Sequence, residues 1–314
     1  MFSICIPSTS INKVKRNLNY INKKVLKSSI IKEIEICIHI NGYDSNINEI
    51  FKDLNHDFKK QFSNSLSKTT FQESYISAVK LATQKFLIVI GDTDKIIYEN
   101  IEKFLLLIKD QKNTKQSYIF DNTECSYELS SEFLDQKLIN LNIKNFEQLL
   151  MPLTPTFIGN VIFNNYFLKN KLSKYSDIKT ELPHFLPYLC SLFDCESAYY
   201  TEPIVDPDDA PRVWSPLQDR FISFDLIRLH VLALKTLSIN NLSLSLFKIP
   251  IIAVRLLPKA ILKELYFLII SKKNSYPYIK QPFWGIIQAY ISCFILFCGY
   301  TLNKLKKLLY LIFN

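Results

Sequence analysis

The chain has 314 residues, of which 48% are hydrophobic and 13% aromatic, so it can bury a full core and is neither disordered nor collagen-like. Its formal net charge is +9, and the basic excess lies at the two ends of the chain. Since these basic residues are interleaved with long apolar runs, they argue against nucleic acid as a partner and favour a membrane surface.

The first hundred residues alternate between apolar β-rich runs and segments with helical spacing. The apolar runs predict three buried strands, at residues 3–6, 36–40 and 86–90. The helical spacing predicts helices at residues 14–25, 47–54 and 71–83. Pro7 is expected to stop the first strand. A strand that is continuously apolar is typical of a sheet covered on both faces, so this region predicts an open, mostly parallel α/β sheet.

The strongest local signal follows the third strand, where Gly91 precedes Asp92-Thr93-Asp94. Ligands of open α/β sheets bind beyond the carboxyl ends of strands, where residues 7–10, 41–45 and 91–94 are all expected to lie. Two carboxylates separated by one residue can share Mg2+ or Mn2+ and leave positions open for a diphosphate. Acidic residues at strand ends are also common as helix caps, so the triplet alone leaves both alternatives open.

The rest of the chain divides into a mixed region and an apolar, basic region. Residues 101–140 predict a helix and a strand at 117–120, and a further apolar run covers 161–163. Pro-rich turns then end the globular unit near residue 215. The predicted domains are therefore residues 1–215, with halves 1–100 and 101–215, and a helical C-terminal region at residues 216–314.

The order of these elements up to residues 85–94 resembles the nucleotide-binding half of family-2 glycosyltransferases. The glycine before the acidic triplet is similar to abequosyltransferase-like enzymes, which build bacterial surface polysaccharides. Residues 157–163 and 181–185 resemble two later landmarks of that subgroup, so the likeness covers roughly residues 1–215. It implies a GT-A fold, that is, a Rossmann-like, mostly parallel central sheet flanked by helices. It also implies metal-dependent and mostly inverting transfer of a sugar from a nucleotide diphosphate donor.

The resemblance also implies roles for individual residues. Pro7, Ser8 and Asn41 are expected at the nucleotide base and ribose of the donor. Asp92 is expected near the ribose or the metal, and Asp94 is expected to bind Mg2+ or Mn2+ directly. A metal held there would neutralise the leaving diphosphate.

The chain departs from the family pattern at two positions. The acidic residue that precedes the Asn-Gly turn in the family is Ile40 here, so either Asp44 takes its place from beyond the turn or base recognition is altered. The middle residue of the acidic triplet is Thr93. These departures support an alternative hypothesis, a non-catalytic GT-A-like scaffold subunit of a membrane glycan-assembly complex.

Sugar transfer needs a general base for the acceptor hydroxyl. Asp177, Glu181 and His184 are the candidates, and Glu181 with His184 is the preferred pair because both lie at the predicted start of a helix. A helix-capping or core histidine is the alternative for His184, and a first-turn acid favoured by the helix dipole is the alternative for Glu181. In the Pro-rich segment that follows, Arg212 is a candidate diphosphate ligand and Trp214 a candidate stacking platform for a sugar; a plain surface connection is the alternative.

The C-terminal region is expected to bind a membrane. Residues 248–307 carry lysines and one arginine against a single acid, Glu264, and residues 283–302 carry no charge. Basic apolar helices of this kind lie at the headgroup level of anionic leaflets, although a spanning helix or an oligomer interface are alternatives. The expected acceptor is a glycan or a lipid-linked glycan, and the expected location is the cytoplasmic face of the bacterial inner membrane.

Overall fold

The computed structural model describes residues 1–25, 32–42, 50–52, 54, 58–109, 114–122, 136–141, 158–180, 182–194, 196–206 and 229. The chain divides into two compact units, Met1–Ala210 and Pro211–Asn314, and every element below belongs to the first. Half of the predicted helix at 47–54 and, apart from residue 229, the predicted C-terminal membrane region lie outside the described residues. Within the described ranges, no helix is both long and apolar enough to cross a bilayer.

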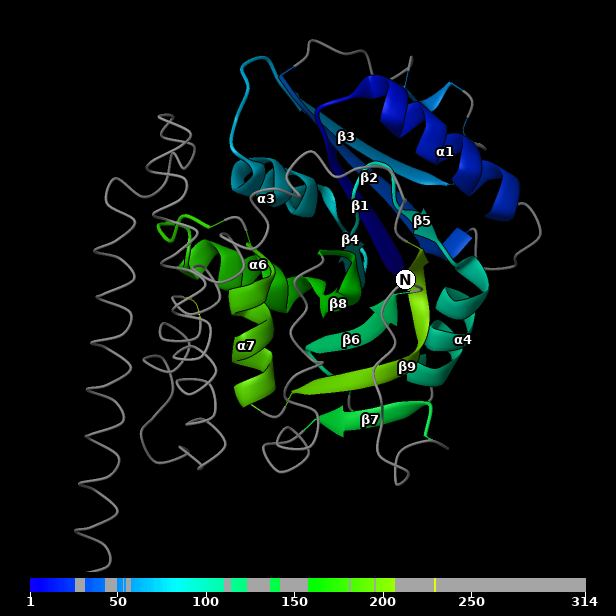
Figure 1. The fold of residues 1–314 in the computed structure, drawn as a ribbon, viewed down its shortest axis with the longest axis vertical. Coiled ribbons are helices and arrows are strands. Elements are labelled where there is room, and N and C mark those ends of the chain that lie inside the picture. Colours follow the sequence, from blue (N-terminus) through cyan, green and yellow to red (C-terminus); the bar gives the residue numbers. More distant parts are fainter. Residues whose placement is uncertain are drawn as a thin grey trace, which may run out of the picture. The chain divides into compact units, whose positions relative to one another are not determined.

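Four strands from the first hundred residues form a fully parallel half-sheet. They are β1 (Phe2–Ser8), β2 (Ile34–Asn41), β3 (Lys59–Ser65) and β4 (Phe86–Val89), in the order β3-β2-β1-β4. The chain therefore moves outward from β1 to β3 and then returns to pair on the other side of β1 (Figure 1). This reversal creates a topological switch point between the carboxyl ends of β1 and β4, where open α/β sheets bind ligands.

The second half of the sheet mixes strand directions. Its strands are β5 (Lys95–Ile96), β6 (Ser117–Asn122), β7 (Leu138–Leu141), β8 (Val161–Asn164) and β9 (Ser197–Asp206). β8 is antiparallel to both β4 and β6, whereas β6 and β9 are parallel. A short 3-10 turn, η3 (Ile158–Asn160), leads into β8 and lies next to the end of β4.

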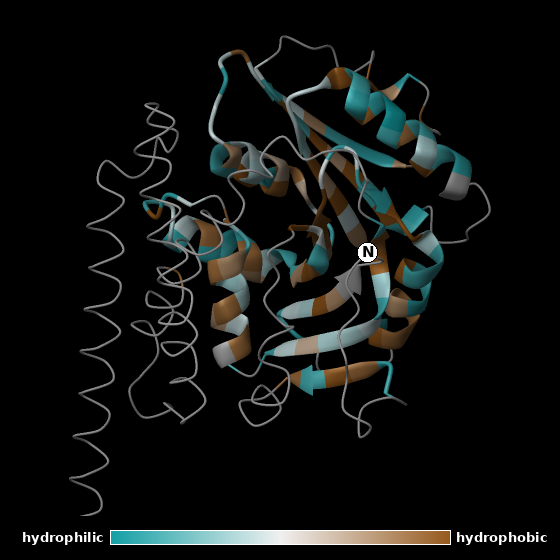
Figure 2. Cartoon of the chain, viewed as in Figure 1, coloured by the Kyte–Doolittle hydropathy of each residue, from teal (hydrophilic) through white to brown (hydrophobic). Residues whose placement is uncertain are grey.

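Helices cover both faces of the sheet. α1 (Ile11–Val25) and α4 (Tyr98–Lys109) lie on one face, and α3 (Phe71–Leu81), α6 (Asn165–Lys174) and α7 (Phe185–Phe193) lie on the other (Figure 1). The central strands are brown in the hydropathy colouring, while α1 is largely teal on its outer side (Figure 2). The predicted helices at 14–25 and 71–83 are confirmed, and so are the apolar strands, because burial on both faces requires continuous apolar runs.

Three features differ from the prediction. Pro7 does not stop β1, which continues to Ser8 with Pro7 opposite His39; the β1–β4 pairing ends at Cys5, so Pro7 needs no ladder donor on that side. β3 was not predicted, because its polar sequence lacks an apolar pattern. The first proline of the predicted Pro-rich turns, Pro203, lies instead within β9, where the β6–β9 register shifts and the ladder is interrupted.

A buried carboxylate, Glu35, joins three segments at the amino end of the sheet. It accepts hydrogen bonds from Ser3 Oγ (2.6 Å), Thr83 N (2.7 Å) and Thr83 Oγ1 (2.8 Å). The Lys59 ammonium lies 3.5 Å from it. Burial by itself raises the pKa of the Glu35 carboxyl, but these hydrogen bonds and the Lys59 charge outweigh it, so the pKa is lowered from its ordinary value. The Glu35 carboxyl is therefore ionised in the folded protein at neutral pH.

Glu35→Gln is expected to lower the free energy of unfolding near neutral pH by about 1–3 kcal/mol, because a charged acceptor of three hydrogen bonds is lost. Since the folded-state pKa is lowered, the contribution is present above the unfolded pKa of about 4.3 and disappears as the pH falls through the folded-state value. Urea unfolding at about pH 7 and about pH 3 measures this, with Glu33→Gln, an exposed carboxylate nearby, as the control. A loss of equal size at both pH values would contradict the account.

Candidate functional site

The ends of β1 and β4 meet at the switch point through two side chains. Ser8, the last residue of β1, donates from Oγ to Asp92 Oδ2 at 2.5 Å. The same oxygen accepts a hydrogen bond from Ser10 N at 2.9 Å, which shapes the loop into α1. The predicted loops at 7–10 and 91–94 are therefore in contact. Pro7 and Ser8 are both buried, and their contact with a nucleotide stays a prediction.

The acidic segment Gly91–Asp94 is a closed turn. Asp94 N donates to Gly91 O at 3.2 Å, and Gly91 N donates to Asp94 Oδ2 at 2.8 Å. Asp94 is consequently only 6% exposed. A Cβ on Gly91 would lie 2.6 Å from Asp94 Oδ2, which explains why glycine precedes the triplet: a larger residue would displace the carboxylate.

Asp92 is the more accessible of the two carboxylates, with 17% of its side chain exposed. The ammonium of Lys13, in the first turn of α1, lies 3.9 Å from Asp92 Oδ1. Lys13 is itself about half exposed, so it can move aside or turn toward a bound anion. Asp92 can therefore exchange the Lys13 ammonium for another cation. Asp94, in contrast, closes the turn through its hydrogen bond with Gly91 N.

The two carboxylates fit the predicted Mg2+ or Mn2+ site in number and chemistry. Each carboxylate oxygen can accept more than one partner, so the bond from Gly91 leaves Asp94 with capacity for a cation. In the described part of the chain, no group of three or more His, Cys, Asp and Glu side chains converges. A hard cation held here would use Asp92 and Asp94 and complete its shell with donor phosphate oxygens and water, as Mg2+ commonly does.

The Asn41 side chain, at the end of β2, holds two neighbouring residues, Ser65 and Thr69, by hydrogen bonds. Its Oδ1 accepts hydrogen bonds from Thr69 N (2.7 Å), Thr69 Oγ1 (3.1 Å) and Ser65 Oγ (3.2 Å), and its Nδ2 donates to Thr69 O (2.9 Å). The side chain is thus engaged in holding the segment that precedes α3, and its contact with the donor stays a prediction. Ile40 lies in the hydrophobic core, so it takes no part in reading a base.

His184 stands at the start of α7, as predicted, but its side chain is fully buried. It makes no capping hydrogen bond to the helix, and its ring lies 6.5 Å from that of Tyr75 on α3. This burial gives no support to a His184 side chain that faces an open cleft, and its role as a general base stays a prediction. A general base must come within hydrogen-bond distance of the acceptor hydroxyl, so the geometry favours the core-histidine alternative.

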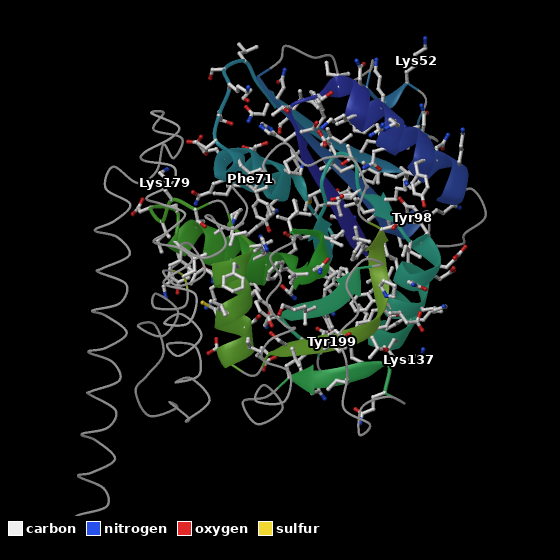
Figure 3. The ribbon with its side chains drawn as sticks, viewed as in Figure 1. Lys52, Phe71, Tyr98, Lys137, Lys179 and Tyr199 are labelled. Carbon is white, nitrogen blue, oxygen red and sulfur yellow. The ribbon has the colours of Figure 1, made fainter. Side chains whose placement is uncertain are left out.

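The segment before Glu181 is fixed to the start of α3 by Gln72. Gln72 Nε2 donates to Ile178 O at 2.8 Å, and Gln72 Oε1 accepts from Thr180 N at 3.1 Å. Figure 3 labels Phe71, which precedes Gln72, and Lys179, which lies between Ile178 and Thr180 in the sequence. Glu181 itself lies outside the described residues, as do Asp44, Arg212 and Trp214, so their predicted roles stay predictions. The structure shows that two hydrogen bonds with Gln72 hold the residues that precede Glu181.

Two contributors to this region were missed from sequence, Asn17 and Gln72. Both are polar residues in helical segments that were interpreted by their apolar spacing. Gln72 is 5% exposed, and so is Asn17. A polar residue on the apolar stripe of a helix was the available signal, since buried polar groups require partners.

No protein-family model and no curated protein matches the chain. Among solved structures, the fold is similar to that of S. aureus TarS 1-349 in complex with UDP-GlcNAc, with a TM-score of 0.58 and 13% identity over 93% of this chain and 81% of that chain. It is also similar to mannosyltransferase PcManGT from Pyrobaculum calidifontis in complex with GDP-Man and Mn2+, with a TM-score of 0.56 and 10% identity over 94% of this chain and 86% of that chain. At these identities the likeness shows the fold, a GT-A-like mixed sheet flanked by helices.

Proposed function

We propose that this chain is a glycosyltransferase that uses a nucleotide diphosphate sugar and Mg2+ or Mn2+. The observation that carries the proposal is the contact of Ser8 with Asp92 across the switch point, which brings the acidic turn to the place where such sheets bind ligands. The complexes of the two structural neighbours with UDP-GlcNAc and with GDP-Man and Mn2+ support the same class of donor.

The polar surroundings of the turn suit a diphosphate. α1 begins at Ile11 beside Ser8 and has no acidic residue in its first turn. The amino end of a helix carries a partial positive charge and free N–H groups, and Lys13 adds a full charge. A cation bound by Asp92 and Asp94 would neutralise charge on the leaving diphosphate.

Glu181 is the proposed general base for the acceptor hydroxyl. Its immediate neighbours Thr180 and Leu182 are linked by a hydrogen bond from Leu182 N to Thr180 Oγ1 at 2.9 Å, and Gln72 fixes Thr180 to α3. These contacts support the proposal because a general base must be held in place relative to the donor. His184, the other member of the predicted pair, is the weaker candidate because its side chain is fully buried.

The proposed acceptor is a glycan, most simply a lipid-linked one in bacterial surface polysaccharide assembly. The support for this part is the uncharged stretch 283–302 and the lysines around it, which suit the cytoplasmic face of a membrane. The abequosyltransferase-like subgroup belongs to the same proposal. A scaffold without catalysis is the alternative, and two carboxylates held at the switch point argue against it.

Release of nucleoside diphosphate from UDP-GlcNAc and from GDP-mannose tests the proposal, using the full chain with Mn2+ or with EDTA. We expect slow release from one of them, by hydrolysis or by transfer to added glycan, that stops with EDTA. Release that is equally fast in EDTA would contradict the metal's role. Tight donor binding without any release, over a panel of glycan acceptors, would support the scaffold instead.

A further inference from the structure

Asn17 is a polar residue buried on the sheet-facing side of α1. It lies between Val14 and Leu18, which belong to the hydrophobic core, and it is only 5% exposed. Its Nδ2 donates to the backbone oxygen of Asp94 at 2.9 Å and to that of Asp92 at 3.4 Å. One side-chain amide thus reaches two carbonyl groups of the acidic turn.

The orientation of this amide follows from its partners. Two carbonyl oxygens can only accept, so the nitrogen of the Asn17 amide must face them. Asn17 Oδ1 is buried and has no hydrogen-bond partner in the described part of the chain. The side chain therefore keeps one buried atom unsatisfied while its nitrogen binds the turn. Leucine would suit both the helix and the core better, so packing gives no reason for asparagine here.

The turn is held from two directions. Ser8 at the end of β1 binds the side chain of Asp92, and Asn17 binds the backbone on either side of Thr93. Because a carboxylate projects from its own backbone, the directions of these two carbonyl groups set where Asp92 and Asp94 emerge. α1 belongs to the core cluster together with β1 and β4, so it provides a rigid support.

We infer that Asn17 is the positioning residue of the acidic turn, keeping both carboxylates in the geometry that a cation and a diphosphate require. This inference rests on the proposed function, because it assigns the turn to the donor. Asn17 touches neither reacting group and acts through Asp92 and Asp94. Loss of a residue that orients metal ligands typically weakens metal affinity about 10- to 100-fold.

The test compares Asn17→Leu with Asn19→Leu in the full chain. Leucine has the same number of side-chain heavy atoms as asparagine with the same branching, favours the helix and removes the donor. Asn19 lies on the same helix and is exposed, so its replacement makes the same chemical change away from the turn. The readouts are hydrogen exchange of peptides covering residues 90–97, thermal stability, and binding of UDP and GDP with Mn2+ or EDTA.

For Asn17→Leu we expect faster exchange in residues 90–97 and Mn2+-dependent nucleotide binding weakened about 10- to 100-fold. The thermal midpoint should fall modestly, because the carbonyl of Asp94 loses a buried donor. Asn19→Leu should change none of these. Unchanged exchange, or faster exchange with unchanged nucleotide affinity, would overturn the role of Asn17 while leaving the proposed function intact. Failure of the unmodified chain to bind either nucleotide would instead defeat the proposed function, and the donor role of Asn17 with it.

Discussion

Replacing Asp94 with asparagine is expected to weaken Mn2+-dependent nucleotide binding by on the order of 100-fold or more, because a ligand contributes more than the residues that orient it. Asparagine keeps an oxygen that can accept the hydrogen bond from Gly91 N, which Asp94 Oδ2 accepts at 2.8 Å. The turn should therefore stay closed, and the free energy of unfolding should fall by only about 1 kcal/mol. Calorimetric titration and thermal unfolding of the same samples measure both effects.

Asp194→Asn is the matched control for this prediction. Asp194 is an exposed carboxylate at the end of α7, so the substitution removes the same charge without touching the turn, and binding should not change. If Asp94→Asn bound nucleotide and Mn2+ as well as the unmodified chain, Asp94 would be a turn-forming residue only. Of the two carboxylates of the acidic turn, Asp92 alone would then be left to bind the cation.

Gly91→Ala is expected to weaken the same binding about 10- to 100-fold by displacing the Asp94 carboxylate. The added Cβ would lie 2.6 Å from Asp94 Oδ2, closer than non-bonded atoms approach, and 3.2 Å from Asp94 Cγ, which is a tight contact. The backbone of Gly91 is not in the left-handed region that requires glycine, so alanine is otherwise tolerated there. The effect should appear in affinity for nucleotide and Mn2+ more than in stability.

A double-mutant cycle isolates the cause of the smaller loss of stability that accompanies the weaker binding. In an Asp94→Ala background the carboxylate is gone, so Gly91→Ala should have almost no further effect on unfolding measured in urea. Additive losses of stability would show that alanine disturbs something other than Asp94. Hydrogen exchange of residues 90–97 in the single variant provides an independent reading of the turn.

The parallel half of the fold was predictable because its strands are buried on both faces. Such strands read as continuous apolar runs, and β1, β2 and β4 all carried that signal. β3 did not, because it pairs with β2 at one edge of the sheet and its side chains are mostly half-buried or exposed. β9 could not be predicted because it contains Pro203. In sequence, a proline at a register shift cannot be distinguished from a proline in a turn.

Only the part of the site that lies within one short segment of sequence could be predicted. The acidic turn follows a buried strand, so its place at the sheet edge could be inferred. The partners that define its geometry come from α1 and β1, about 75 residues or more away in the chain, and no spacing rule connects them to it. The burial of His184 likewise depends on α3, since Tyr75 packs against it.

The most direct test of the central claim is calorimetric binding of UDP, GDP, CDP and dTDP to the full chain, with Mn2+ or with EDTA. The account predicts that one of these nucleotides binds with Mn2+, that EDTA abolishes the binding, and that Asp94→Asn greatly weakens it. Binding of none of the four under either condition would contradict the assignment of a donor site to the acidic turn.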